Sequence, residues 1–379
     1  MTYIKNAKIV LENGILFDGV LAVEKDRIIN VGTKAEISIP DTAQVIDADG
    51  AYVGPGFVDI HVHGGGDAMF FDNPEKAARH FLSHGETTIL PTFYCTMNKE
   101  AFLQGIERVQ KAKKEPIGKV LAGFYMEGPY LNPKHGADSK NNQWSGEIKQ
   151  EDYKEVVDKA GQDVKVWVVA PERKGIDGFM EYAKSVNQAV CFAVGHSEAS
   201  LSQINEVKKY GVHILTHCMN ATGTVPTRRG TKACGPDEAC FLSDEMYAEL
   251  ISDSLGIHVT PELQRLIVKI KGIDKIILIS DSFVTDFESP ESLRYTDLSF
   301  AENGDLCGSK LTMDVACRNF MKHTSYGIAQ TFLAASRNPA RVLGLDNEIG
   351  SIAIGKKANL VFVDDLFNVK KVMLEGEII

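Results

Sequence analysis

The middle of the chain alternates short apolar runs with amphipathic stretches, and this alternation limits the possible folds more than any other feature. Helical periodicity is present in the stretches at 74–82, 99–113 and 200–209. The eight apolar runs lie at 56–61, 87–91, 120–126, 164–169, 190–194, 212–215, 246–251 and 275–279. Continuous apolar strands are typical of a parallel sheet that is buried on both faces. Eight of them within about 250 residues predict a (β/α)8 barrel, with a doubly wound open sheet as the alternative.

Both ends of the chain lack helical periodicity and carry short β-type runs between Gly, Asp and Asn residues. These runs lie at 19–23, 27–29, 44–46, 358–363 and 371–374. Because the two ends resemble each other and differ from the middle, we expect them to pair into one small β domain. The middle of the chain is then an insertion between its two halves.

Charge and cysteine content narrow the expected partners and compartment. The chain has 41 Lys and Arg against 51 Asp and Glu, a formal net charge of −10, and no basic run. This balance argues against nucleic acid or an anionic membrane surface as the main partner. No stretch approaches the about 20 apolar residues of a membrane span, and the first residues lack the apolar run of a signal peptide. Seven cysteines without a CxxC pair predict free thiols in the cytoplasm.

Titratable side chains recur where the predicted strands end. His61 and His63 close the first run and lie on one face of the strand with Asp59. The others are Glu127 after the third run, His196 after the fifth, His217 after the sixth and Asp281 after the eighth. Each of them alone is compatible with a purely structural role. Together they lie at the face where barrel enzymes keep their active sites, and they predict a divalent metal site.

These residue types predict hydrolysis by an activated water molecule. A bound divalent ion lowers the pKa of its water to about 7 and polarises a carbonyl group. We expect Asp281 to take the proton from that water and to pass it to a leaving amine. The chain has no GxSxG motif, which favours direct attack by water over a covalent acyl-enzyme.

Several of these motifs resemble the amidohydrolase superfamily and, within it, the N-acetylglucosamine-6-phosphate deacetylases. The HVH at 61–63, the later GH and TH pairs and the aspartate after the eighth run are shared across the superfamily. NPA at 338–340 and GSIAIGK at 350–356 form a C-terminal pattern that is also shared across the superfamily. More specific are MEGPYLN at 126–132 and GSKLTM at 308–313. The resemblance covers nearly the whole chain. It implies deacetylation of an N-acetyl amino-sugar 6-phosphate. It also implies a barrel at 53–346 and a small β-sandwich domain formed by 1–52 and 347–379.

The same resemblance implies a role for particular residues. Glu127, His196 and His217 hold the main metal, and Asp281 is the acid and base. Because family members with the HxH pair can hold a second ion, His61 and His63 make one or two ions per subunit possible. Zinc, iron and manganese all suit these ligands. A homodimer is implied, in which Arg228 reaches the sugar phosphate bound by the partner subunit. The other implied substrate-binding residues are Ala137, Asp138, Asn220, Ala221, His258, Leu306, Cys307 and Gly308.

The chain departs from the family pattern mainly in the substrate loops. Thr222 follows Asn220 and Ala221, where the family usually has Met, and two extra residues precede His258. Asp138 stands where many members have His, and Asp281 lies in Ser-Asp-Ser instead of Thr-Asp-Ala. None of these changes removes a metal ligand. The departures therefore bear on which amino sugar is bound, and the sequence leaves that configuration open.

Two other functions are alternatives to deacetylation for a chain of this fold. A superfamily enzyme that opens cyclic amides commonly uses a carboxylated lysine as a bridging ligand. The fourth run here ends in VAPER at 169–173 without a lysine, and Glu127 takes that place. A non-catalytic scaffold of the same fold typically loses ligands, whereas this chain keeps all of them.

Overall fold

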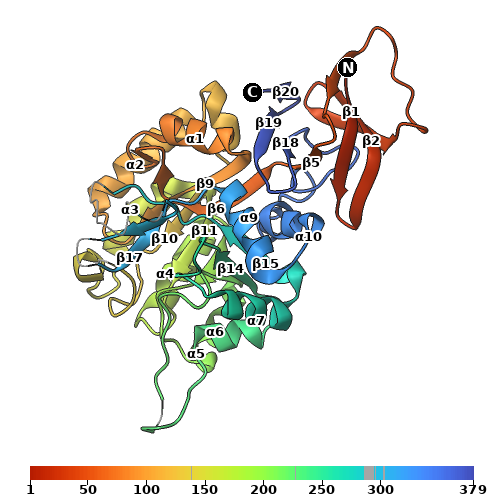
Figure 1. Cartoon of the computed structure of the whole chain (residues 1–379). Helices are drawn as coiled ribbons and strands as arrows, with labels where there is room; N and C mark the ends of the chain where they lie inside the picture. The colour runs from red at the N-terminus through yellow and green to blue at the C-terminus, as the bar shows by residue number, and fades with distance from the viewer. Residues whose placement is uncertain (138, 227, 286–293, 295, 302–303) are drawn as a thin grey trace.

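The computed structural model describes residues 1–137, 139–226, 228–285, 294, 296–301 and 304–379. At its centre lies a parallel sheet of eight strands that neighbour one another in chain order (Figure 1). The strands are β6 (Phe57–Val62), β9 (Glu86–Tyr94), β10 (Phe124–Glu127), β11 (Val164–Val169), β12 (Cys191–Val194), β13 (Val212–Leu215), β14 (Tyr247–Ile251) and β15 (Ile276–Ile279). Each predicted apolar run overlaps one of them. The third run is strand only from Phe124 onward, because its first residue belongs to a 3-10 turn.

The sheet closes on itself between its first and last strands. The backbone N–H of Asp281 donates to the carbonyl of His61 at 2.9 Å, and that of His63 donates to the carbonyl of Ser282 at 2.9 Å. Both bonds lie just beyond the carboxyl end of β15, so the two strands meet at the rim where strand-end side chains gather. A doubly wound open sheet would instead have a change of strand order near its first strand. The predicted barrel is confirmed.

Helices surround the barrel and share its apolar core (Figure 1). The α-helices are α1 (Pro74–Ser83), α2 (Lys99–Ala112), α3 (Gln150–Ala160), α4 (Ile176–Val186), α5 (Leu201–Val207), α6 (Pro236–Phe241), α7 (Pro261–Lys271), α9 (Met313–Thr324), α10 (Ile328–Phe332) and α11 (Asn338–Val342). Shorter turns are η1 (Pro116–Val120), η2 (Ser139–Asn141), η3 (Gly161–Asp163), η4 (Lys208–Tyr210), η5 (Ile273–Lys275) and the π-helical η6 (Leu333–Arg337). Several helices start where a side-chain oxygen accepts from a free backbone N–H, as Asn73, Asn98 and Thr260 do for α1, α2 and α7.

The two ends of the chain form one mixed sheet beside the barrel (Figure 1). Its strands are β1 (Thr2–Leu11), β2 (Gly14–Glu24), β3 (Arg27–Thr33), β4 (Gln44–Asp47), β5 (Tyr52–Pro55), β18 (Leu360–Val363), β19 (Val369–Leu374) and β20 (Glu377–Ile378). β18 pairs antiparallel with β5, which joins the C-terminal strands to the N-terminal ones. Ile9, Val53 and Phe362 share one apolar cluster in this sheet. The predicted β domain from both termini is confirmed. Its exact boundaries stay a prediction, and β5 extends its sheet to Pro55.

Two short antiparallel pairs complete the strands. They are β7 (Gly64–Gly65) with β8 (Ala68–Met69), and β16 (Leu298–Phe300) with β17 (Leu306–Ser309). β17 is also tied to the loop after β15, because the Ser309 N–H donates to the carbonyl of Asp281 at 2.8 Å. Among the described residues, the helices are all too short or too polar to cross a membrane.

Candidate metal centre

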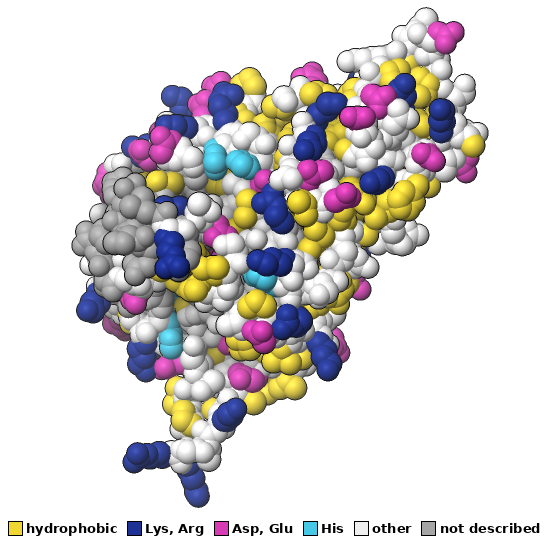
Figure 2. All heavy atoms as spheres, viewed as in Figure 1, with side chains coloured by type: hydrophobic (Ala, Val, Ile, Leu, Met, Phe, Trp, Pro, Cys, Tyr) yellow, Lys and Arg dark blue, Asp and Glu magenta, His cyan; other side chains and the backbone are white. Residues whose placement is uncertain are grey.

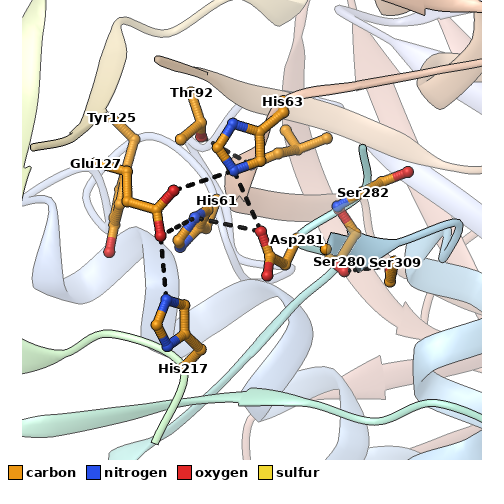
Figure 3. A network of polar contacts seen from close by, with 12 residues as sticks. His61, His63, Thr92, Tyr125, Glu127, His217, Ser280, Asp281, Ser282 and Ser309 are labelled. Atoms are coloured by element: carbon orange, nitrogen blue, oxygen red, sulfur yellow. Dashed lines mark hydrogen bonds and ion pairs between the residues drawn. The ribbon is translucent and has the colours of Figure 1, made fainter. Parts of the chain in front are cut away.

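The barrel brings the six predicted strand-end residues to one rim. His61 lies near the end of β6 and His63 directly follows that strand, while Glu127 is the last residue of β10. The remaining three, His196, His217 and Asp281, stand two residues beyond the ends of β12, β13 and β15. Figure 3 shows the side chains of His61, His63, His217 and Asp281 directed toward Glu127. Five of the six residues are buried, and His196 is partly buried.

Three of these residues have a left-handed backbone conformation. The φ angles are 44° at His196, 29° at His217 and 48° at Asp281. Residues other than glycine rarely adopt this region, and each such residue costs on the order of 1–3 kcal/mol. The same sharp turn after three different strands directs the three side chains inward, toward the mouth of the barrel. Strain of this kind is characteristic of sites whose geometry serves a function.

Glu127 stands at the centre of the group. Its Oε1 lies 2.8 Å from His196 Nε2 and 3.1 Å from His217 Nε2. Its Oε2 lies 3.3 Å from His63 Nε2, and Oε1 lies 3.7 Å from His61 Nε2. The ligand atoms form two overlapping groups, His61 with His63 and Glu127, and Glu127 with His196 and His217. Within each group all atoms lie within 4.8 Å of one another.

The donor atoms fit divalent ions. Nitrogen and oxygen ligands at about 2.0–2.2 Å from a tetrahedral ion stand about 3.3–3.5 Å apart, close to the separations seen here. His61 Nε2 is buried without a hydrogen-bond partner among the described residues. It faces Asp281 Oδ1 at 3.5 Å and Glu127 Oε1 at 3.7 Å. An ion between these atoms would satisfy a nitrogen that is otherwise left unpaired.

Outer contacts give three of the imidazoles the same orientation. In each of His61, His196 and His217, Nε2 faces the centre and Nδ1 faces an oxygen acceptor. The acceptors are Glu249 Oε2 at 3.3 Å from His61, the His135 carbonyl at 3.3 Å from His196, and the Asn220 carbonyl at 3.1 Å from His217. An imidazole that donates its proton from Nδ1 keeps the Nε2 lone pair for a metal. The surroundings therefore select the ligating tautomer at all three positions.

Two buried carboxylates dominate the electrostatics of the rim. Burial alone would lower the pKa of His61, but Asp281 and Glu127 raise it well above its usual value of 6.5. The pKa values of His63 and His217 are raised in the same way, against the effect of burial. Burial would raise the pKa of Glu127, yet His61 and His196 hold it well below its usual range. Both carboxylates thus stay ionised, and their negative potential attracts either protons on the imidazoles or a metal cation.

Asp281 occupies the outer side of the group. Its Oδ1 lies 3.2 Å from His63 Nε2, and its side chain retains 12% exposure. Burial would raise its pKa, but His61 and His63 lower it below the usual value. Asp281 is therefore an ionised carboxylate at the edge of the metal centre, where it can accept a proton from a water molecule.

Some of the predicted substrate-binding residues lie beside Asp281. A Cβ atom at Gly308 would stand 2.6 Å from the Asp281 carbonyl, so the close approach of β17 requires glycine, whose φ is +60°. His258 Nε2 lies 3.1 Å from the Gly308 carbonyl. Leu306 and Cys307 precede Gly308 in β17 and are partly buried. The structure thus places Leu306, Cys307, Gly308 and His258 along one side of the mouth.

The longer segment before His258 closes around Asp253. The Asp253 carboxylate accepts from the backbone N–H groups of Leu255, Ile257 and His258 at 2.9–3.1 Å, and it lies 3.1 Å from His258 Nδ1. Although burial opposes it, the bond with His258 and the backbone N–H groups lower the pKa of Asp253 to about 2. The two extra residues therefore form a turn around an ionised carboxylate that holds the His258 ring against β17.

The remaining predicted residues lie in loops. Ala137 is partly buried in the loop after β10, and Asp138 lies outside the described residues. Asn220 and Ala221 lie in the loop after His217, beyond Cys218 and Met219, and Ala221 has a φ of 54°. Arg228 is exposed on the long loop between β13 and α6, which projects from the body of the barrel (Figure 1). Within the described part of its own chain, Arg228 forms no ion pair. Figure 2 shows Lys and Arg side chains at the tip of that loop.

Sequence reasoning missed two buried residues of this centre, Glu249 and Tyr125. Glu249 is fully buried in β14, and its side chain contacts His61 and the backbone N–H of His217. Tyr125 in β10 donates to Glu249 and stacks on the His61 ring. A signal was present, because a glutamate inside an otherwise apolar strand is almost never buried without a partner.

The amidohydrolase family profile matches residues 52–379, which is most of the chain. This chain belongs to the amidohydrolase family. Among curated relatives, the N-acetylglucosamine-6-phosphate deacetylase of Bacillus subtilis is 26% identical, over 99% of this chain and 96% of that protein. The N-acetylgalactosamine-6-phosphate deacetylase of Escherichia coli O157:H7 is 29% identical, over 100% of this chain and 99% of that protein.

A solved structure agrees with these relatives. The N-acetyl-D-glucosamine-6-phosphate deacetylase of Mycobacterium smegmatis, an Asp-to-Ala mutant in complex with N-acetyl-D-glucosamine-6-phosphate, superposes with a TM-score of 0.83. It is 25% identical, and the match covers 100% of this chain and 98% of that chain. The resemblance seen in the motifs is confirmed along the full length of this amidohydrolase.

We predict that pH acts in opposite directions on the metal-free and the metal-loaded protein. His61, His63 and His217 have raised pKa values in the folded chain without metal. Their contribution to stability is complete below pH 6.5, the pKa of histidine in the unfolded chain. It is lost as the pH rises through the higher pKa values of the folded chain. Metal competes with protons for the same nitrogens, so stabilisation by metal increases over that same range.

Thermal unfolding of chelator-treated and zinc-loaded protein between pH 6 and pH 9 measures both effects. The difference in Tm between the two forms is expected to widen as pH rises. A difference that stays constant over this range would contradict the assignment of these histidines as ligands.

Proposed function

We propose that this amidohydrolase is a metal-dependent deacetylase of an N-acetyl amino-sugar 6-phosphate, which releases acetate and the amino-sugar phosphate. The observation that carries the proposal is the pair of ligand groups that share Glu127, with Asp281 at their open edge. The full-length similarity to deacetylases of two such sugar phosphates supports the substrate class. The seven cysteines, none of them in a disulfide, support our further proposal of a cytoplasmic location.

Glu127, His196 and His217 would hold one divalent ion, and His61 and His63 would hold a second ion that shares Glu127. Zinc, iron and manganese are all compatible with this donor set. A bound ion would lower the pKa of water and polarise the acetyl carbonyl. The chain's own residues keep the ligands dry and oriented, because four of the five ligand side chains are buried and three of the imidazoles have their Nδ1 against an acceptor.

Asp281 would move the proton during the reaction. Its carboxylate is ionised and partly exposed, next to His63 Nε2 at 3.2 Å. In this role it accepts a proton from the water that attacks the amide carbon, and it returns that proton to the amine as the C–N bond breaks. The bonds from Asp281 N to the His61 carbonyl and from Ser309 N to the Asp281 carbonyl hold its backbone in place.

The sugar would lie between the loops on either side of Asp281. We propose His258, Asn220, Ala221, Ala137 and Asp138 as its contacts, together with the β17 residues Leu306, Cys307 and Gly308. The phosphate needs concentrated positive charge, and the guanidinium of Arg228 suits it. Because Arg228 lies on a loop that projects from its own barrel, we propose that it acts on the partner site of a homodimer (Figure 1).

The end of β11 weighs against opening of a cyclic amide. An enzyme of that kind would be expected to have a metal-bridging lysine there, and this chain has none. The acidic residue nearest to that strand end, Glu172, already accepts hydrogen bonds from other loops. Its oxygens accept from Asn132, Ser197 and the backbone N–H of Glu198 at 2.7–2.8 Å. This carboxylate thus ties loops together, and Glu127 would be the ligand shared by two bound ions.

We predict that the metal-loaded chain releases acetate from N-acetylglucosamine 6-phosphate and that a chelator abolishes the release. The unphosphorylated sugar is expected to react far more slowly, because it lacks the charge that Arg228 would bind. Acetate is measured for the glucosamine, galactosamine and mannosamine epimers in parallel, with a hydantoin and a dihydropyrimidine as competing substrates. The ratio between epimers identifies the sugar. Absence of acetate from every sugar phosphate, with metal bound, would refute the proposed substrate class.

We predict that Asp281→Asn lowers kcat by about 10²–10⁴-fold, because the amide cannot accept the proton. Metal content, measured by elemental analysis, is expected to stay near that of the unchanged chain. Asp314→Asn is the matched control, since Asp314 is a buried aspartate that pairs with His84 away from the metal centre. Near-normal turnover of Asp281→Asn would eliminate the proposed proton transfer.

We predict that two inactive variants restore activity when they are mixed. Arg228→Ala lacks the phosphate contact, and Asp281→Asn lacks the proton acceptor. In a mixed dimer, one site combines an intact Asp281 with the arginine of the partner subunit. Random exchange of subunits between equal amounts is therefore expected to recover about a quarter of the normal activity. If Arg228 acts within its own subunit, or if the protein is a monomer, mixing recovers none.

A further inference from the structure

Glu249 is a buried carboxylate that the proposed reaction does not use. It lies in the middle of β14 with 0% exposure, behind the ligands rather than among them. Its Oε2 lies 3.3 Å from His61 Nδ1 and accepts from the backbone N–H of His217 at 3.2 Å. Tyr125 Oη donates to it at 2.9 Å. A buried charge with this many partners is a built feature of the site, because its desolvation is costly unless it is compensated.

Two contacts together restrict the His61 ring. Glu249 holds Nδ1, and the Tyr125 ring stacks on the imidazole with centroids 4.4 Å apart and planes at 29°. The Tyr125 hydroxyl is itself placed by Glu249 and by Thr216 Oγ1 at 2.8 Å. His61 Nδ1, the Glu249 carboxylate, the Tyr125 hydroxyl and Thr216 Oγ1 are thus all paired, and together they direct His61 Nε2 at the carboxylates of the rim.

The other ligand group does not depend on Glu249 in the same way. The rings of His196 and His217 are oriented by the carbonyl groups of His135 and Asn220. Glu249 contacts the backbone N–H of His217 and not its ring. Loss of the Glu249 charge would thus act first on His61, and through it on the group formed by His61, His63 and Glu127.

We propose that Glu249 is a positioning residue for the second metal site, the one formed by His61, His63 and Glu127. It fixes the His61 tautomer that presents Nε2 to the ion, and it places a negative charge behind that ligand. Outer carboxylates of this type commonly change metal affinity by about 10–100-fold. The inference rests on the metal centre of the proposed function and not on the identity of the sugar.

Metal titration of the full chain tests the proposal without any substrate. Zinc is titrated calorimetrically into chelator-treated protein, for the unchanged chain, Glu249→Gln and Tyr125→Phe. Glu249→Gln keeps the size of the side chain but removes its charge. We expect the unchanged chain to have two classes of zinc site. In Glu249→Gln, we expect the affinity of one class to fall by about 10–100-fold while the other class keeps its affinity.

Tyr125→Phe is the matched control, because it removes a hydrogen bond to the same carboxylate and keeps both the ring stacked on His61 and the Glu249 contact. Both zinc affinities are expected to remain within about threefold, since the Glu249 contact to His61 is kept. Thermal unfolding shows whether the two variants lose comparable stability. If Glu249 had only a structural role, Glu249→Gln would lose stability but keep its zinc affinity at both classes of site. That result would overturn the proposal.

Two further outcomes are decisive. If Glu249→Gln does not fold, Glu249→Asp is measured instead, because the shorter side chain keeps the charge but moves it away from His61. Unchanged zinc affinities at both classes of site in Glu249→Asp would also overturn the proposal. An unchanged chain that binds a single ion also overturns it, whereas deacetylation with one ion would stand. Conversely, a selective loss in Glu249→Gln supports the proposal even where no acetylated sugar phosphate is hydrolysed.

Discussion

The site depends on one buried charge, the carboxylate of Glu127. It is in contact with all four imidazoles of the rim, at 2.8–3.7 Å, and it is common to both groups of possible ligands. A carboxylate in such a place would be protonated if it were alone, because burial disfavours its charged form. The surrounding imidazoles reverse this, and its pKa falls well below the usual range. This buried negative charge must be compensated by positive charge, which either protonated imidazoles or a bound cation can supply.

The architecture of the barrel makes this concentration of charge possible. Parallel strands end at the same rim, so residues that are far apart in the chain meet there with their side chains converging. The cost is local strain at His196, His217 and Asp281, whose φ angles are all positive. Tight packing beneath the rim and hydrogen bonds between the first and last strands hold these turns in place. A flexible loop could not maintain three such conformations at once.

The loops around the rim serve a different purpose from the rim itself. The turn that contains the extra residues before His258 is organised by Asp253, and it still delivers the imidazole to β17. The departures from the family pattern thus lie mainly in the loops that we propose as sugar contacts, and every predicted metal ligand is present. This division agrees with two relatives that match this chain along almost its full length but are named for different amino-sugar phosphates.

The sequence by itself determined the barrel, the β domain from both termini and the six residues at the strand ends. Hydrophobic periodicity specifies strands and helices locally, and parallel strands have only one rim at which their carboxyl ends meet. The distances within the centre, the strained turns and the role of Asp253 required the tertiary structure. Glu249 is the clearest example, because a glutamate in an apolar strand shows only that a partner must exist. Which residue it meets is decided by the stagger of β14 against β6 and β10 across the barrel, and no local pattern encodes that stagger.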